Sequence, residues 1–302
     1  NPFKMKKNIF ILFSAVMLLA CFSCSSQTEI APKPVEPITS MPTTFVKGAD
    51  VGWLPQMEAT GYRFLDQDGT VKDALQLLKD RGMNTVRLRV WVNPSNHKID
   101  GHCSKEETVT MAVRAQKLGM RVMINFHYSD SWADPAKQNK PLAWTNHTVA
   151  QLKQDVYNHT FDVISALKQA GVTPEWVQVG NEIPGGMLWP EGSTSNWSQL
   201  AQFLNSGYDA VKAVDSKIKV VVHVDEGNNN AKFRWFFDAA TAQNVKYDII
   251  GLSYYPYWIQ KDYTQTIADL STNMNDLVAR YNKDVMVVEV GGEYDKVQNT
   301  YE

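Results

Sequence analysis

The sequence has little of three features that would each point to a particular class of protein. It has three cysteines, and only Cys103 lies beyond the amino-terminal region, so the rest of the chain cannot form an internal disulfide. Its formal net charge is −2, whereas a nucleic-acid partner calls for a basic surface. No Gly-x-Gly-x-x-Gly follows the first strand-like run, which argues against a nucleotide-binding sheet. This composition favours a neutral polymer or a small neutral molecule as partner.

The amino terminus has the order of segments that directs a protein to export. Residues 5–7 (MKK) are basic, and the apolar run Ile9 to Ala20 is too short to span a bilayer. LLAC, ending at Cys21, resembles a bacterial lipoprotein box, and CFSC, ending at Cys24, is a second candidate. We expect residues 1–24 to be a signal peptide with a lipidated cysteine, so that the protein is lipid-anchored to the bacterial cell envelope, at the outer membrane or the cell surface. A plain signal peptide or an uncleaved anchor is the alternative.

The rest of the chain divides into a tether and a regular domain. Residues 25–44 are rich in Pro, Ser and Thr and lack periodicity, which predicts an extended linker. From Phe45 to Glu302, short strand-like runs alternate with amphipathic helical stretches. The strand-like runs are 45–53, 85–92, 121–130, 175–183, 219–227, 248–258 and 284–292. Helices are predicted, for example, over 70–82, 107–119, 149–171 and 200–215.

This alternation predicts an α/β fold with a parallel sheet, because parallel neighbours need a crossover connection between them. Strands about 40 residues apart favour a TIM (β/α)₈ barrel over a doubly wound sheet. The chain ends soon after the seventh strand-like run, so strand eight is expected to be missing and residues 45–302 to be a barrel truncated at its carboxyl end. A barrel without strand eight exposes two strand edges. We therefore expect the natural protein to continue beyond Glu302.

Polar and aromatic side chains gather at the carboxyl ends of the predicted strands, which is where barrel enzymes build their active sites. The residues are Asp50, Arg87, Arg89, His127, Asp130, Asn181, Glu182, His223, Asp225, Tyr254, Tyr255 and Glu289. For any one of them, a hydrogen-bonded strand end is the favoured explanation. Their occurrence on all seven strands indicates a functional site.

Two glutamates at these strand ends suggest a reaction. Glu182 follows the fourth strand and Glu289 ends the seventh, on opposite sides of a closed barrel. Paired carboxylates about 5 Å apart, one protonated and one ionised, carry out glycoside hydrolysis with retention of configuration. An ion pair with an arginine such as Arg89 is the structural alternative for Glu289. Both can hold, because a neighbouring arginine keeps a nucleophilic carboxylate ionised.

Several motifs resemble those of glycoside hydrolase clan A, and within it of family 53, the endo-β-1,4-galactanases. They are RVWVNPS (89–95), FHYSDSWADP (126–135), GNEIPGGMLWPEG (180–192), VVHVDEG (221–227) and SYYPYW (253–258). The resemblance implies retaining hydrolysis of β-1,4-galactan or arabinogalactan, with Glu182 as acid/base and Glu289 as nucleophile. Family members place an aromatic residue two positions beyond the nucleophile. This chain has Gly291 there, so we expect one wall of the site to be built differently.

The resemblance also implies a substrate-binding set. Asn181 would hold the hydroxyl beside the reacting carbon, and Arg89 and His127 would support the glutamates. Asp130, Trp132, Trp189, Asp225, Tyr255 and Trp258 would line the sugar cleft. It implies a monomer with no cofactor and no metal in the active site, a structural calcium being possible in the missing carboxyl-terminal region.

Three other functions stay open from the sequence. A metal-dependent hydrolase could use His127, Asp130, His223 and Asp225 as ligands, although the first strand lacks the His-x-His arrangement typical of such barrels. A non-catalytic glycan-binding lipoprotein would keep the tryptophans without needing both glutamates. A clan A enzyme acting on mannan, xylan or cellulose would keep the glutamates and change the cleft. Cys103 lies in a loop-like stretch with no base nearby in sequence, so a catalytic role for it is not expected.

Overall fold

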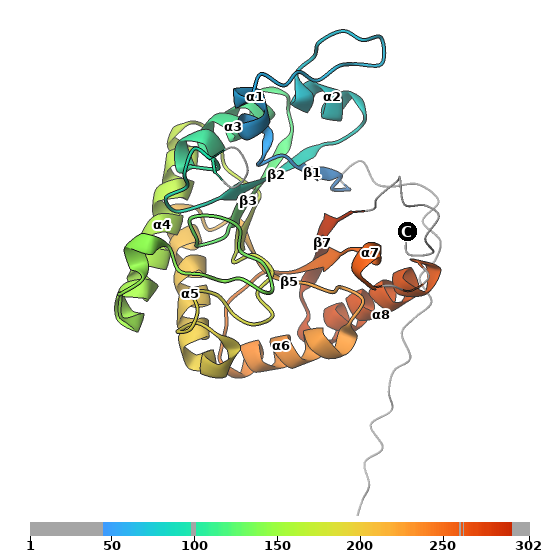
Figure 1. Ribbon diagram of the computed structural model, residues 1–302. Helices are drawn as coiled ribbons and strands as arrows, with labels where there is room; N and C mark the ends of the chain where they lie inside the picture. The colour runs from blue at the N-terminus through green and yellow to red at the C-terminus, as the bar shows by residue number, and fades with distance from the viewer. Residues whose placement is uncertain (1–44, 98–100, 260, 262, 292–302) are drawn as a thin grey trace, which may run out of the picture. The chain divides into compact units, whose positions relative to one another are not determined.

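The computed structural model describes residues 45–97, 101–259, 261 and 263–291 (Figure 1). The predicted signal peptide (1–24), the linker through residue 44 and residues 292–302 lie outside this part of the chain. Within the described ranges, no helix is long and apolar enough to cross a lipid bilayer.

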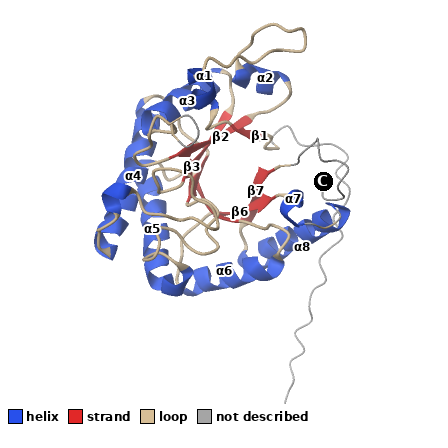
Figure 2. Ribbon diagram, viewed as in Figure 1, coloured by secondary structure: helices blue, strands red, loops and turns tan. Residues whose placement is uncertain are grey.

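The described strands form one parallel sheet of seven, in which each strand pairs with the next one along the chain. The strands are β1 (Gly48–Asp50), β2 (Thr85–Val90), β3 (Arg121–Phe126), β4 (Trp176–Val179), β5 (Lys219–Val224), β6 (Ile249–Tyr254) and β7 (Asp284–Val290). Figure 2 shows them around a common centre with the helices outside. All seven predicted strands are present, and the predicted α/β barrel architecture is confirmed.

Helices follow the strands and cover the outer face of the sheet. They are α1 (Leu54–Ala59), α2 (Ala74–Asp80), α3 (Lys105–Lys117), α4 (Val149–Gln169), α5 (Trp197–Val214), α6 (Asn230–Ala242), α7 (Pro256–Ile259) and α8 (Tyr263–Tyr281), with short 3₁₀ turns at Leu142–Trp144 and Thr194–Asn196. Capping boxes fix the starts of two long helices: Ser104 with Glu107 begins α3, and Thr148 with Gln151 begins α4.

Side chains alternate between the two faces of each strand, as the two-residue period of a strand requires. On β5, Val220, Val222 and Val224 pack in the large apolar core against the helices. Val221 belongs instead to a small second cluster inside the ring of strands, together with Met123, Trp176, Ile249 and partly buried Val46, Met286 and Val288. This cluster forms a floor near the amino-terminal half of the strands. Inward side chains farther along the strands are polar, and they form the site.

A β-bulge interrupts the pairing of β6 with β7. Leu252 pairs with Val287 and the next residue, Ser253, pairs with Glu289, so Val288 is one residue extra on β7. Met286 and Val288 pack in the inner cluster, and strict alternation would therefore turn Glu289 outward toward the helices. The bulge turns Glu289 inward beside Ser253.

Gly207 on α5 packs closely against the strand leading to Glu182. A Cβ at this position would lie 2.6 Å from Val179 Cγ1 and 3.0 Å from the Tyr128 hydroxyl. Helix propensity alone makes Gly→Ala stabilising by about 1 kcal/mol. We expect Gly207→Ala to lower the free energy of unfolding by roughly 1–3 kcal/mol, because overpacking outweighs that gain. Chemical denaturation measures this, with exposed Gln202→Ala on the same helix as control. A more stable Gly207→Ala variant would contradict the prediction.

Candidate active site

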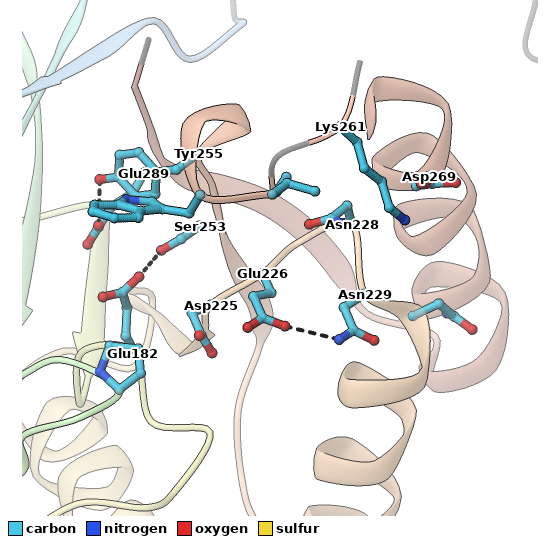
Figure 3. A pocket seen from close by; sticks show the side chains of 14 residues that line it. Glu182, Asp225, Glu226, Asn228, Asn229, Ser253, Tyr255, Lys261, Asp269 and Glu289 are labelled. Atoms are coloured by element: carbon cyan, nitrogen blue, oxygen red, sulfur yellow. Dashed lines mark hydrogen bonds between the residues drawn. The ribbon is translucent and has the colours of Figure 1, made fainter. Parts of the chain in front are cut away.

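A cavity of about 950 Å³ opens at the carboxyl ends of β4 to β7. Figure 3 shows the residues that line it, with Glu182 and Ser253 joined by a hydrogen bond and Tyr255 beside Glu289. Asp225 and Trp258 also contribute to the lining. The cavity thus brings together both glutamates and three of the predicted cleft residues.

Glu182 is held by its backbone as well as its side chain. Its φ of 45° is a left-handed conformation that a non-glycine residue rarely adopts. Its N–H donates to His223 Nδ1 at 3.2 Å, and its carbonyl accepts from Gln138 Nε2 at 3.0 Å. The Ser253 hydroxyl donates to Oε1 at 2.6 Å. Burial, followed by the negative charge of Glu289, raises the pKa of Glu182 to about 7, so the carboxyl can hold a proton near neutral pH.

Glu289 lies in the opposite electrostatic environment. Its Oε1 is 2.8 Å from Arg87 Nη2, and its Oε2 accepts from the Tyr255 hydroxyl at 2.9 Å. Burial, and then the charge of Glu289, raises the pKa of Tyr255, so the phenol stays protonated and donates. Glu289 thus has a buried guanidinium on one carboxylate oxygen and a phenol O–H on the other, both of them hydrogen-bond donors.

The arginine that pairs with Glu289 is Arg87, not Arg89, which the sequence had suggested. Arg87 and Arg89 are both inward residues of β2, but Arg89 lies one layer nearer the opening. Its guanidinium carbon is 3.9 Å from the ring centre of Trp132, and its Nη1 is 3.5 Å from Asp50 Oδ1. In these contacts Arg89 supports an aromatic side chain rather than a glutamate.

His127 also supports Trp132 instead of a glutamate. Its Nδ1 accepts the Ala133 N–H at 3.0 Å, and its ring meets those of Trp91 and Trp132 edge-on. Burial, and then the charge of Arg87, lowers the pKa of His127 well below its usual value, so the ring is neutral. Trp132 keeps 41% of its surface exposed and can offer a ring face to a sugar.

Asn181 lies beneath the two glutamates in a buried layer of amides. Its Oδ1 accepts from Arg87 Nη2 and from Asn125 Nδ2, each at 2.9 Å. Its Nδ2 donates to the Ala133 carbonyl at 2.8 Å, and an amide nitrogen has a second N–H for a ligand. Gln178 adds to this layer by accepting from Arg87 Nη2 at 3.1 Å. Asn125 and Gln178 were not found from the sequence, although each is a polar residue within an otherwise apolar strand.

Two predicted cleft residues have structural contacts of their own. Asp130 accepts the backbone N–H of Asn93 at 3.0 Å and that of Leu142 at 2.8 Å, one on each carboxylate oxygen. It therefore ties two loops together. Trp189 donates from Nε1 to the Gly185 carbonyl at 2.9 Å, and a Cβ on Gly185 would lie 2.9 Å from its ring. The glycine after Pro184 thus makes room for the tryptophan.

Asp225 and Trp258 lie on the other side of the cavity. Asp225 Oδ1 is 2.7 Å from Lys232 Nζ, while burial raises the pKa of this aspartate. Trp258, on α7, is 75% exposed and packs edge-on against Tyr257. Tyr254, at the end of the same strand as Ser253, faces away from the cavity, because its hydroxyl contacts Thr266 on α8.

The wall beyond Glu289, which the sequence predicts to differ from that of family members, contains Gly291 packed against Tyr255. A Cβ on Gly291 would lie 2.8 Å from Tyr255 Cε1, so the Tyr255 ring occupies the space that a larger residue at 291 would need.

Cys103 is buried, its thiol donates to the Gly52 carbonyl at 3.0 Å, and burial raises the pKa of this thiol to about 11. This environment disfavours the thiolate that a nucleophilic cysteine needs.

Across the described ranges, no group of three or more His, Cys, Asp or Glu side chains is arranged to hold a metal ion. The four residues considered as metal ligands bind protein groups instead. Asp130 binds two loop N–H groups, His127 binds Ala133, His223 binds Glu182 and Ser253, and Asp225 binds Lys232.

A barrel with a protonatable glutamate and an ion-paired glutamate across one cavity has the architecture of a glycoside hydrolase. The sequence profile described as Glycosyl hydrolase family 53 matches residues 46–302. The chain belongs to this family.

Individual relatives are similar over most of the chain. A probable arabinogalactan endo-β-1,4-galactanase A from Neosartorya fischeri is 35% identical over 250 residues, covering 80% of this chain and 68% of that protein. The arabinogalactan endo-β-1,4-galactanase of Thermothelomyces thermophilus is 33% identical over 249 residues, covering 80% and 73%. Among solved structures, the GH53 catalytic domain of Ignisphaera aggregans superposes with a TM-score of 0.77 at 35% identity, covering 85% of this chain and 71% of that one. A structure from a study of two fungal β-1,4-galactanases gives 0.75 at 35%, covering 81% and 73%.

The environment of Glu182 should destabilise the fold at neutral pH. Its pKa is 4.5 in an exposed state and about 7 here, so the folded state binds the proton more tightly. The contribution of Glu182 to the free energy of unfolding is therefore fully present below pH 4.5 and is lost as the pH rises through 7. The total loss is at most roughly 3 kcal/mol. We expect Glu182→Gln to melt at a higher temperature than the parent at pH 8, and to differ much less at pH 4.5. Thermal unfolding at both pH values measures this, and an equal difference at both would refute it.

Proposed function

We propose that this protein is an endo-β-1,4-galactanase that cleaves galactan or arabinogalactan with retention of anomeric configuration. Glu182, protonated, gives its proton to the glycosidic oxygen, while ionised Glu289 attacks the anomeric carbon and forms a covalent glycosyl-enzyme. Glu182 then takes a proton from the water that hydrolyses this intermediate. Glycans with other β-1,4 linkages are the competing substrates.

The observation that carries this proposal is the opposite setting of two carboxyls in one cavity. Burial and a like charge raise the pKa of Glu182, which suits a proton donor, whereas the carboxylate oxygens of Glu289 contact the Arg87 guanidinium and accept from the Tyr255 hydroxyl. A retaining glycosidase needs one carboxyl that donates a proton and a second that attacks as an anion. Membership of family 53 and the names of the relatives support galactan as substrate, and the exposed rings of Trp132 and Trp258 suit an uncharged sugar chain.

A comparison of polysaccharides tests the substrate. The mature protein is incubated with unbranched β-1,4-galactan, arabinan, xylan and mannan, and the products are separated by size. We expect galactan alone to give a series of short oligosaccharides early in the reaction. Glu289→Gln is the control for contaminating activity. Release of oligosaccharides from xylan or mannan in preference to galactan would overturn the substrate assignment.

The two glutamates are distinguished by leaving-group dependence. Glu182→Gln should lose at least about 100-fold in kcat on galactan and much less on a nitrophenyl β-galactobioside, whose leaving group needs no proton. Glu289→Gln should lose activity on both, because no covalent intermediate forms. Added azide should give the inverted glycosyl azide with Glu289→Gly and the retained one with Glu182→Gly. Equal losses on both substrates for the two Gln variants, with no azide product, would reject these roles.

We propose further that the chain is exported and lipid-anchored to the cell envelope through Cys21 or Cys24. The order of basic residues, apolar run and cysteine in residues 5–24 supports this. Replacing both cysteines with Ser should move the protein from the membrane fraction to the soluble fraction in a bacterial host. Cys103→Ser is the matched control and should stay with the membranes. Unchanged membrane retention of the double variant would contradict lipidation.

A further inference from the structure

Two side chains from neighbouring strands, His223 and Ser253, form a line of hydrogen bonds that ends on Glu182, which follows β4. His223 Nε2, on β5, lies 2.7 Å from Ser253 Oγ, on β6. Ser253 Oγ lies 2.6 Å from Glu182 Oε1, and its hydroxyl donates to that oxygen. His223 and Ser253 are 0% and 1% exposed, so bulk water does not compete for these contacts. Figure 3 shows the last link, with the Ser253 hydroxyl facing the Glu182 carboxyl.

The direction of the protons along this line follows from the other contacts of His223. The backbone N–H of Glu182 donates to His223 Nδ1 at 3.2 Å. Gln178 Nε2 lies 2.9 Å from the same nitrogen, and its amide orientation is set because its Oε1 faces Arg87, which can only donate. Two donors therefore meet Nδ1, which carries no proton. Burial, and then the charge of Arg87, keeps the ring neutral by lowering the pKa of His223, so the single ring proton is on Nε2.

The tautomer of His223 fixes the role of Ser253. His223 Nε2–H donates to Ser253 Oγ, and the only proton of that hydroxyl is then free to donate to Glu182 Oε1. Oε1 is thus an acceptor whether or not the carboxyl is protonated. Because the carbonyl oxygen of a carboxylic acid is a better acceptor than its hydroxyl oxygen, this contact favours the acidic proton of Glu182 on Oε2.

We propose that Ser253, oriented by His223, is a positioning residue that confines the acid/base proton of Glu182 to Oε2. This inference rests on the proposed acid/base role of Glu182. The β-bulge supports it, because the same irregularity that turns Glu289 inward pairs it directly with Ser253. The strand register thereby sets the proton donor and the nucleophile at one level of the cavity.

The charges around Glu182 give the sign of the expected effect. Glu289 on β7 and Asp225 after β5 oppose its ionisation, Arg87 on β2 favours it, and His223 is neutral. The Ser253 hydroxyl also favours the ionised carboxylate, because it donates to it. Without this donor, Glu182 should keep its proton to higher pH. It should also transfer the proton to the glycosidic oxygen less readily, because the proton is then no longer confined to one carboxyl oxygen.

The test is the pH dependence of kcat/KM on galactan for Ser253→Ala. We expect the alkaline limb to move upward by about one pH unit, the size of one hydrogen bond to a charged group. We also expect kcat on galactan to fall about tenfold and kcat on the nitrophenyl substrate to fall much less. The acidic limb should not move. Ser253→Thr, which keeps a donor hydroxyl, should retain the parent profile.

Tyr254→Phe is the matched control. It removes a buried hydroxyl contact from the next residue of the same strand, on the face toward α8, so it should lower the melting temperature without moving the alkaline limb. If Ser253→Ala folds poorly, Ser253→Cys replaces it, because a thiol is a weaker hydrogen-bond donor than a hydroxyl. The alkaline limb of kcat/KM should then also move upward.

The outcomes separate this inference from the proposed function. Loss of galactan activity in Glu182→Gln, with a parent-like alkaline limb in Ser253→Ala, would leave the function standing and reject the role of Ser253. An equal shift in Tyr254→Phe would also reject it, as a general effect on the fold. Retained galactan activity in Glu182→Gln would reject both.

Discussion

The buried guanidinium of Arg87 is the interaction on which the rest of the site depends. It forms ion pairs with Asp50 and Glu289, and it donates to the amide oxygens of Gln178 and Asn181. A charge with so little exposure is tolerated only when it is paired and hydrogen-bonded. Asp50, Glu289 and the amides of Gln178 and Asn181 are therefore arranged around one cation. A substitution that removes one of these partners leaves the buried charge of Arg87 less compensated.

This arrangement explains how two glutamates in one cavity come to differ. Arg87 lies in direct contact with Glu289 and only influences Glu182 from a distance. The ionised Glu289 then opposes the ionisation of Glu182, which burial already disfavours. One arginine, placed nearer to one carboxyl than to the other, thus creates a proton donor and an anion from the same residue type.

The sequence predicted the barrel and both glutamates, but it assigned some side chains to the wrong partners. Arg87 and Arg89 are two residues apart on β2 and face the same interior, so the sequence indicates that both point inward without saying which one reaches Glu289. Asp130 follows β3 as an active-site residue would, yet loop N–H groups occupy both of its oxygens. The sequence could not choose between the two arginines or find these loop contacts of Asp130, because strand periodicity gives the face of a residue, whereas its layer and its loop contacts depend on neighbours distant in sequence.

The sequence by itself determined the parallel sheet, the order of its strands and the end of the sheet at which the site lies. These follow from the spacing of apolar runs and from the requirement that parallel strands be joined by crossovers. Only the tertiary structure shows how Glu289 comes to face the cavity, because an extra residue on β7 reverses the side-chain alternation that Met286 and Val288 would otherwise impose. It also decided that Ser253 and His223 meet Glu182, since these contacts join three strands and depend on their register, which no local pattern encodes.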